Sequence, residues 1–298
     1  MTSILTNNTA MAALQTLRNV NSSLSKTQNA VSSGERVGKA ADNAAYWSIA
    51  TTMRSDNTAL SAVSDALGMG AAKVDTAYTA VQSSIDVVTE IKAKLVAATE
   101  EGVDKTKIQD EITQLQAQLK SVAASASFNG QNWVQNSIGA TMSVVSSFVR
   151  DSSGGVSVTT TSYITTATDL LFDTAGTNGI LGTNGAKFTT ASISSFSISS
   201  TSTKGDIDNL ISDTETALVK MTALGSKLGS MSTRIDLQSE FVSKLTDSIK
   251  SGVGRLVDAD MEAESSKLTA LQTQQQLAVQ SLSIANSASQ NILSLFRS

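Results

Sequence analysis

The densest group of potentially reactive side chains is a run of four carboxylates, Asp258, Asp260, Glu262 and Glu264. Carboxylates bind Ca²⁺, so a calcium site is one interpretation of the run. However, the spacing lacks the twelve-residue frame and the loop glycine of a helix–loop–helix calcium site. Carboxylates are also favourable at the N-terminus of a helix, where the helix dipole is positive. We therefore predict that the run marks the start of a helix and is not a metal site.

Other kinds of chemistry are limited by what the sequence lacks, since its 298 residues include no His, no Cys and no Pro. Without His, the chain lacks the most common general base and metal ligand. Without Cys, it has no thiolate nucleophile. No Gly-rich phosphate-binding loop follows a predicted strand. We therefore expect a protein that is not an enzyme and that uses no cofactor. The absence of Pro favours long, unbroken helices.

Charge and hydropathy exclude two further classes of partner. The net charge is −4 and the pI is about 5.0, whereas a nucleic-acid-binding domain normally presents a basic face. No stretch approaches the roughly eighteen apolar residues of a membrane-spanning helix, and the N-terminus lacks the basic and apolar regions of a secretory signal peptide. These features predict a cytoplasmic protein unless a dedicated export route exists.

Aromatic residues make up only 4% of the chain, which makes the pair Tyr46-Trp47 and the single Trp133 conspicuous. Exposed rings could form a binding patch. Large rings more often anchor a core where a linker or turn meets a helix, so we predict that all three are anchors.

Apolar and small residues recur at alternating intervals of three and four, which predicts long helices that pack as in a coiled coil. The first such helix covers about five heptads, ends near residue 100, and is followed by a second, antiparallel helix over about residues 108–126. The C-terminal third predicts another long helix from about residue 207 to residue 256. The seam of the first helix consists of Leu60, Val63, Leu67, Gly70, Val74, Ala77, Val81, Ser84, Val88, Ile91 and Leu95.

Both ends of the chain carry the same kind of stripe, and we expect these two helical arms to pack against each other. The N-terminal arm ends at Ser33-Gly34. Gln275 and Ser289 are polar seam residues, which would fix the register of the pair. Because single helices are marginal in water, we expect the arms to order fully only when other subunits cover them. The proposed arm-packing residues are Met11, Leu14, Leu17, Val20, Leu24, Val31, Leu268, Leu271, Gln275, Leu282, Ile292, Leu293 and Phe296.

The middle of the chain, residues 137–204, loses the helical period and is rich in Ser and Thr. Short β-branched runs at 142–149 and 192–198 predict strands joined by Gly turns. The expected fold is mainly α: a long antiparallel, coiled-coil-like bundle formed by both termini, with a small β-rich central insertion. Its predicted parts are arms (1–34 with 262–298), a helical body (35–136 with 205–261) and an outward-facing domain (137–204).

Several motifs of the terminal regions resemble those of bacterial flagellins. Residues 32–45 (SSGERVGKAADNAA) and 48–50 (SIA) are similar to the N-terminal signature, and 127–130 (SFNG) to the turn after the second body helix. Residues 254–264 (GRLVDADMEAE), 282–286 (LSIAN) and 289–293 (SQNIL) are similar to the C-terminal signature. The resemblance covers roughly residues 1–135 and 205–298 and is nearest to the rhizobial branch of the alphaproteobacteria.

This resemblance implies a subunit that polymerises into the extracellular flagellar filament after export through the flagellum's own channel. The implied partners are copies of the chain, sister flagellins, an export chaperone, and the cap and junction proteins; nucleic acid and membrane insertion are not implied. The alternatives are a hook–filament junction protein, which shares the terminal helices, and an enzyme built on a helical scaffold. The insertion, without His or Cys, speaks against the enzyme.

The resemblance also implies two segments that face immune receptors of plants and animals. The candidate residues are Asp42, Asn43, Tyr46, Trp47, Ile91 and Leu95. Many flagellins have Gly-Leu where this chain has Tyr46-Trp47, and an Arg where it has Ile91. We therefore expect weak or absent recognition by both receptors.

Overall fold

The computed structural model describes residues 7–151 and 153–295 and confirms a mainly α fold with a small β part. Its contacts divide the chain into two compact units, one with the described residues up to Thr58 and from Asp247 on, the other spanning Ala59–Thr246. Helices α2 (Ala44–Ala97) and α4 (Lys204–Val257) each contribute to both units. These divisions lie inside the two helices, whereas the sequence placed the arm boundaries at residues 34 and 262.

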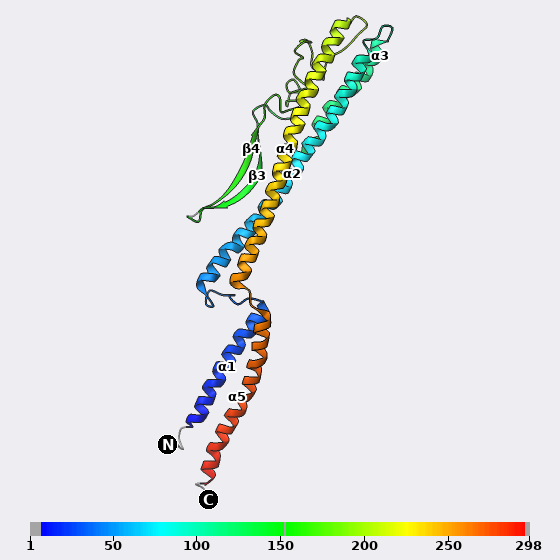
Figure 1. Ribbon diagram of the computed structural model, residues 1–298. Helices are drawn as coiled ribbons and strands as arrows, with labels where there is room; N and C mark the ends of the chain where they lie inside the picture. The colour runs from blue at the N-terminus through cyan, green and yellow to red at the C-terminus, as the bar shows by residue number, and fades with distance from the viewer. Residues whose placement is uncertain (1–6, 152, 296–298) are drawn as a thin grey trace. The chain divides into compact units, whose positions relative to one another are not determined.

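Two antiparallel helices form the arms of the first unit, α1 (Asn8–Ser33) and α5 (Met261–Leu295) (Figure 1). Asn7 caps α1, because its side-chain oxygen accepts a hydrogen bond from the Ala10 amide at 3.0 Å. Gly34 ends α1 as the sequence predicted. Its φ of 72° is left-handed, and its amide donates to the Ala30 carbonyl at 2.9 Å.

The segments after α1 and after α4 are joined by backbone hydrogen bonds. The amides of Arg36 and Val37 both donate to the Val257 carbonyl, at 2.7 and 3.2 Å, and the Ala259 amide donates to the Gly34 carbonyl at 2.8 Å. A small apolar core supports this joint. It consists of the buried residues Ala50, Val253 and Val257, with Met53, Ile249 and Leu256 packed against them.

The second unit contains the coiled-coil-like body, and every predicted seam position from Leu60 to Leu95 is buried. Asp75 on α2 accepts a hydrogen bond from Ser232 on α4, and Lys92 pairs with Glu215, so the two helices run antiparallel here. Helix α3 (Lys105–Ser125) begins at an Asp104 cap and folds back on α2, where Lys94 contacts Glu111 at 2.7 Å. The predicted break near residue 100 is therefore confirmed.

The β structure consists of two antiparallel hairpins. The first, β1 (Ser127–Phe128) with β2 (Gln131–Asn132), turns through Asn129 and Gly130, which both have positive φ. The second, β3 (Thr141–Arg150) with β4 (Val156–Ile164), confirms the predicted strand at 142–149 and has a register shift between Val145 and Ser147.

The predicted strand at 192–198 is wrong, because this segment has only an isolated bridge at Ser192, a turn over 193–195 and irregular structure after it. Its carbonyls at Ile193 and Phe196 accept hydrogen bonds from the buried Gln116 amide, at 3.1 and 3.0 Å, and its Ile198 amide donates to the Gln109 side chain at 2.8 Å. Side chains of α3 thus satisfy backbone groups that a partner strand would otherwise satisfy. The β-branched residues are buried, as in a strand, but without a sheet.

Candidate assembly surfaces

The seam between α1 and α5 contains most of the predicted arm residues but not all of them. Leu24 and Leu271 are buried. The half-buried residues are Leu17, Val20, Val31, Leu268, Gln275 and Leu282. Met11 and Leu14 lie on the exposed side of α1, at 59% and 39% exposure, so they do not pack in the seam of a single chain. Ile292 and Leu293 belong to the last turns of α5, and Phe296 lies outside the described residues.

Polar contacts cross the same seam at two positions along the helices. Gln275 donates from Nε2 to Asn21 Oδ1 at 2.8 Å, and Asn7 donates from Nδ2 to the Ala285 carbonyl at 2.9 Å. The sequence identified Gln275 as a polar seam residue but missed its partner and missed Asn7. The signal that could have found both is their spacing, since Asn7 and Asn21 are two heptads apart and so share a helix face.

The seam buries little apolar surface for helices of this length. Among the described side chains of α1 and α5, only Ala10, Leu24, Thr27, Leu271 and Ala278 are buried. A second set of apolar side chains points away from the seam, namely Met11, Leu14, Leu277, Val279 and Ile284, with Ile284 exposed to 69%. Each arm helix therefore has one apolar face against its partner and further apolar side chains in solvent.

The aromatic anchors are confirmed in one case and wrong in the other. Trp133 is buried, at 4% exposure, whereas Tyr46 and Trp47 are 39% and 37% exposed. The start of α2 needs no ring to fix it, because Asn43 Oδ1 accepts a hydrogen bond from the Tyr46 amide at 3.1 Å. Ala50, one turn later, supplies the buried contact to Val253 and Val257.

The residues predicted to face immune receptors are partly exposed and partly buried. Asp42 and Asn43 are exposed, and Asp42 accepts a hydrogen bond from the Lys39 amide at 3.0 Å. Ile91 and Leu95 are fully buried, with 0% exposure, which corrects the expectation that they face outward. Both occupy seam positions of α2, and the spacing of three and four residues that defines the seam turns these side chains toward the helical body.

The acidic run marks the start of a helix, as predicted. Asp260 Oδ1 accepts hydrogen bonds from the amides of Glu262 and Ala263, both at 3.1 Å, and so caps α5. Glu262 and Glu264 lie in the first turn of that helix. Over residues 7–151 and 153–295, no three Asp or Glu residues are grouped so that they could hold a metal ion. No helix in these ranges is long and apolar enough to span a membrane.

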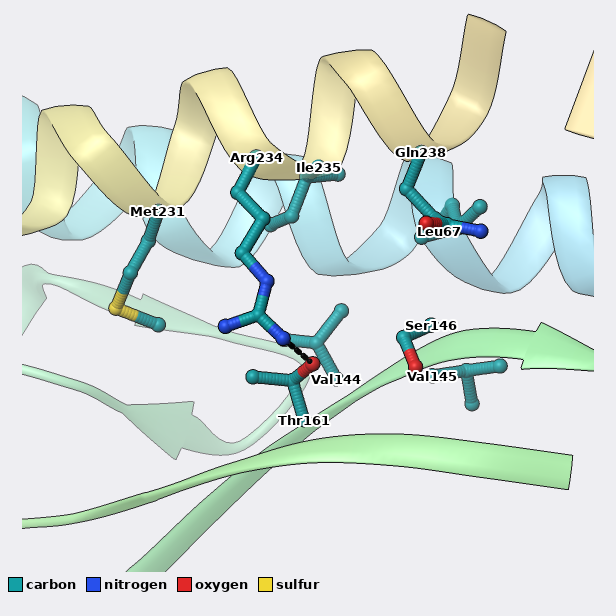
Figure 2. A pocket seen from close by; sticks show the side chains of 9 residues that line it. All are labelled: Leu67, Val144, Val145, Ser146, Thr161, Met231, Arg234, Ile235 and Gln238. Atoms are coloured by element: carbon teal, nitrogen blue, oxygen red, sulfur yellow. Dashed lines mark hydrogen bonds between the residues drawn. The ribbon is translucent and has the colours of Figure 1, made fainter. Parts of the chain in front are cut away.

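The β3–β4 hairpin lies against α2 and α4 in the second unit. A cavity of about 100 Å³ lies between these elements. Figure 2 shows the side chains that line it, among them Arg234 on α4, which donates a hydrogen bond to Thr161 on β4. The two atoms are 2.9 Å apart. Met142 and Val144 are the buried residues of β3. The sequence did not indicate where the hairpin would dock.

A buried charge holds the segment after β4. Asp169, at 6% exposure, pairs with Lys227 on α4 at 2.9 Å and accepts hydrogen bonds from the Thr166 amide and hydroxyl. Burial disfavours the charged carboxylate, but the hydrogen bonds from Thr166 and Lys227 outweigh it and lower the pKa of Asp169 to about 2. Lys227 also lies over the Tyr163 ring, 4.4 Å from its centroid.

Comparison with known proteins finds similarity along the whole chain. Residues 4–138 match the bacterial flagellin N-terminal helical region, and residues 211–296 match the bacterial flagellin C-terminal helical region. Flagellin A of Rhizobium meliloti is 50% identical to this chain, and Flagellin C of Rhizobium meliloti strain 1021 is 51% identical. Both chains are fully covered in each comparison. A flagellin of Brucella melitensis biotype 1 is 45% identical over 298 residues, again with full coverage of both chains.

Proposed function

This chain belongs to the bacterial flagellin family, and we propose that its α1–α5 pair is the element through which it polymerises. As a flagellin, the chain is a structural subunit of the flagellar filament, the helical propeller of swimming bacteria. Nothing in the chain favours the alternative role at the hook–filament junction.

The observation that carries the proposal is the thin seam between α1 and α5. A 26-residue helix and a 35-residue helix share only five buried side chains among those described. Two of these are Ala, and the Thr27 hydroxyl has no hydrogen-bond partner among the described residues. Since helices gain most of their stability from packing an apolar face, this pair needs further cover. Copies of the same chain supply that cover in a filament.

The surface proposed for these contacts consists of Met11 and Leu14 on α1 with Leu277 and Ile284 on α5. All four are exposed to 39% or more in one chain. Leu277 and Ile284 are seven residues apart, so they share one face of α5. Fully burying an exposed side chain of this size is worth about 1.5–3 kcal/mol, so covering these partly exposed side chains stabilises an interface by a fraction of that each.

We further infer that the chain acts outside the cell and reaches the filament through the flagellum's own export route. The proposed partners on this route are an export chaperone, the cap and the junction proteins, with sister flagellins as possible co-subunits. The lack of Cys supports passage of an unfolded chain, because no disulfide has to form or open. We also propose that residues 137–204 face outward from the filament.

Seeded growth tests the central proposal. Filaments are dissolved in acid, returned to neutral pH with short seeds, and imaged by electron microscopy. We expect long filaments from the unaltered chain and much slower growth from Ile284→Gln. The matched control is Val158→Gln, which removes a similarly exposed apolar side chain from β4 in the other unit. Absence of filaments from the unaltered chain, or equal growth of the two variants, would refute the role of the arms.

A further inference from the structure

The chain contains three Asn-Gly pairs, at residues 129–130, 178–179 and 184–185. In such a pair the backbone nitrogen of Gly can attack the side-chain amide of Asn, because Gly has no side chain that shields its nitrogen. The Asn residue of each pair is exposed to solvent. Sequence and exposure therefore make the three pairs equally reactive, and only their local hydrogen bonds distinguish them.

The pair Asn178-Gly179 is held by a carboxylate and by burial. Asp173 accepts hydrogen bonds from Asn178 Nδ2 at 2.9 Å and from the Asn178 backbone amide at 3.1 Å. Gly179 is buried, and a Cβ atom placed on it would lie 2.7 Å from the Leu171 carbonyl oxygen. Attack on the Asn178 side chain would require these contacts to open first.

The pair Asn184-Gly185 is held at both reacting groups. Asn184 Nδ2 donates to the Thr189 carbonyl at 3.0 Å. The Gly185 amide, which carries the attacking nitrogen, donates to the Ala191 carbonyl at 3.2 Å. Two hydrogen bonds must therefore break before this nitrogen can reach the side chain.

The pair Asn129-Gly130 has no such restraint. Among the described residues, neither the Asn129 side chain nor the Gly130 amide has a hydrogen-bond partner. The turn joins β1 and β2, which pair over only two residues each, and two-stranded hairpins are marginal by themselves. Asn129 also has a φ of 50°, a conformation uncommon for a residue with a side chain. Opening of this turn therefore breaks few contacts and relieves an unfavourable backbone conformation.

We propose that Asn129 is a site of spontaneous deamidation, independent of the role in polymerisation. The Gly130 nitrogen forms a bond to Asn129 Cγ, the bond from Cγ to the side-chain nitrogen breaks, and ammonia leaves with the proton of the Gly130 amide. Water then opens the five-membered imide and leaves aspartate or isoaspartate. The product adds one negative charge to a chain of net charge −4.

The modification changes the turn directly before a contact with the helical body. Gln131 on β2 accepts a hydrogen bond from Lys73 on α2 at 2.9 Å. Isoaspartate lengthens the backbone between β1 and β2 by one carbon atom, so the two strands no longer meet across a two-residue turn. Deamidation thus alters the hairpin that carries Gln131.

Peptide mapping of the full-length free subunit tests the proposal. The subunit is incubated at mildly alkaline pH, both folded in buffer and unfolded in urea, then digested with trypsin and analysed by tandem mass spectrometry. Cleavage after Lys and Arg places Asn129 in peptide 121–150 and the other two sites in peptide 151–187. In urea, the three sites should react at similar rates.

In the folded subunit, Asn129 should gain one mass unit at least about tenfold faster than Asn178 and Asn184, the effect expected where two hydrogen bonds must open first. If folding protects Asn129 as strongly as it protects the other two sites, the proposal is wrong. Faster reaction at Asn178 or Asn184 would overturn it as well.

Ion-exchange chromatography of the intact subunit gives a second measurement, because deamidation produces a more acidic form. Asn129→Gln keeps a side-chain amide but would have to form a six-membered ring, which is slow, so most of the acidic form should disappear. Asn184→Gln is the matched control at a restrained pair and should leave its accumulation unchanged. Circular dichroism checks that both variants are folded. An acidic form that accumulates equally fast in Asn129→Gln and in the unaltered chain would contradict the site.

Discussion

Val144 on β3 occupies the space that a side chain on Gly70 of α2 would need. Its Cγ1 atom lies 2.2 Å from the position that a Cβ atom on Gly70 would take, far inside van der Waals contact. Glycine in a helix interior costs about 1 kcal/mol relative to alanine. Here that cost accompanies the close approach of the hairpin to the helix, with Val144 buried at 6% exposure.

Gly70→Ala should therefore loosen the hairpin and lower the free energy of unfolding. The overpacked methyl group costs about 1–3 kcal/mol, which exceeds the gain in helix propensity. Gly68→Ala is the matched control, because nothing lies within 4 Å of its Cβ position. This control should stabilise the subunit by up to about 1 kcal/mol. Urea unfolding of both variants, followed by circular dichroism, measures the difference. Equal stability would contradict the close contact.

Gln116→Leu should destabilise the second unit by about 2–4 kcal/mol. The buried amide of Gln116 donates to the carbonyls of Ile193 and Phe196, and leucine would leave both without that donor. Gln118→Leu, at an exposed position of α3, should change stability by no more than about 0.5 kcal/mol. Urea unfolding midpoints compare the two. If Gln116→Leu proves as mild as the control, water or rearranged turns must satisfy these carbonyls.

Acid should remove the stability that Asp169 contributes. Its pKa is about 2 in the folded chain, below the ordinary 3.8, so the contribution is present above about pH 4 and is lost as the pH falls toward 2. The difference of nearly two pKa units corresponds to roughly 2 kcal/mol. Asp169→Asn should lack this part of the pH dependence. Unfolding free energies of free subunits between pH 2 and 6 test it, and parallel curves for the two proteins would contradict it.

Gln275→Leu should alter the shape of the filament or slow its growth. Gln275 contacts Asn21 across the seam, and a polar pair there sets the register of two helices at some cost in stability. The double-mutant cycle with Asn21→Leu tests whether the two residues act as a pair. Growth rates and electron micrographs of the two single variants and the double variant are compared. Strictly additive effects, or an unaltered filament, would argue against a role in register.

Local sequence determined the helices and their buried faces. A period of three and four residues is enough to define which side of a helix is apolar, and all eleven predicted seam positions from Leu60 to Leu95 are buried. Gly34 ended α1 as predicted because a left-handed residue after a helix favours glycine. The acidic run marks the start of α5, with Asp260 as its cap and Glu262 and Glu264 in its first turn, for the same local reason, the dipole and free amides of a helix start.

Contacts between distant segments decided the rest. Residues 192–198 have the composition of a strand, but their backbone groups form hydrogen bonds with side chains of α3, and no sheet forms. Periodicity placed Met11 and Leu14 in the arm stripe, yet the way α1 meets α5 leaves them in solvent. From the sequence, Gly70 is one more small residue in a helix seam. In the structure, Val144 of the hairpin lies 2.2 Å from the position that a Cβ atom on Gly70 would take. Such a contact depends on two segments about seventy residues apart, and neither segment encodes it alone.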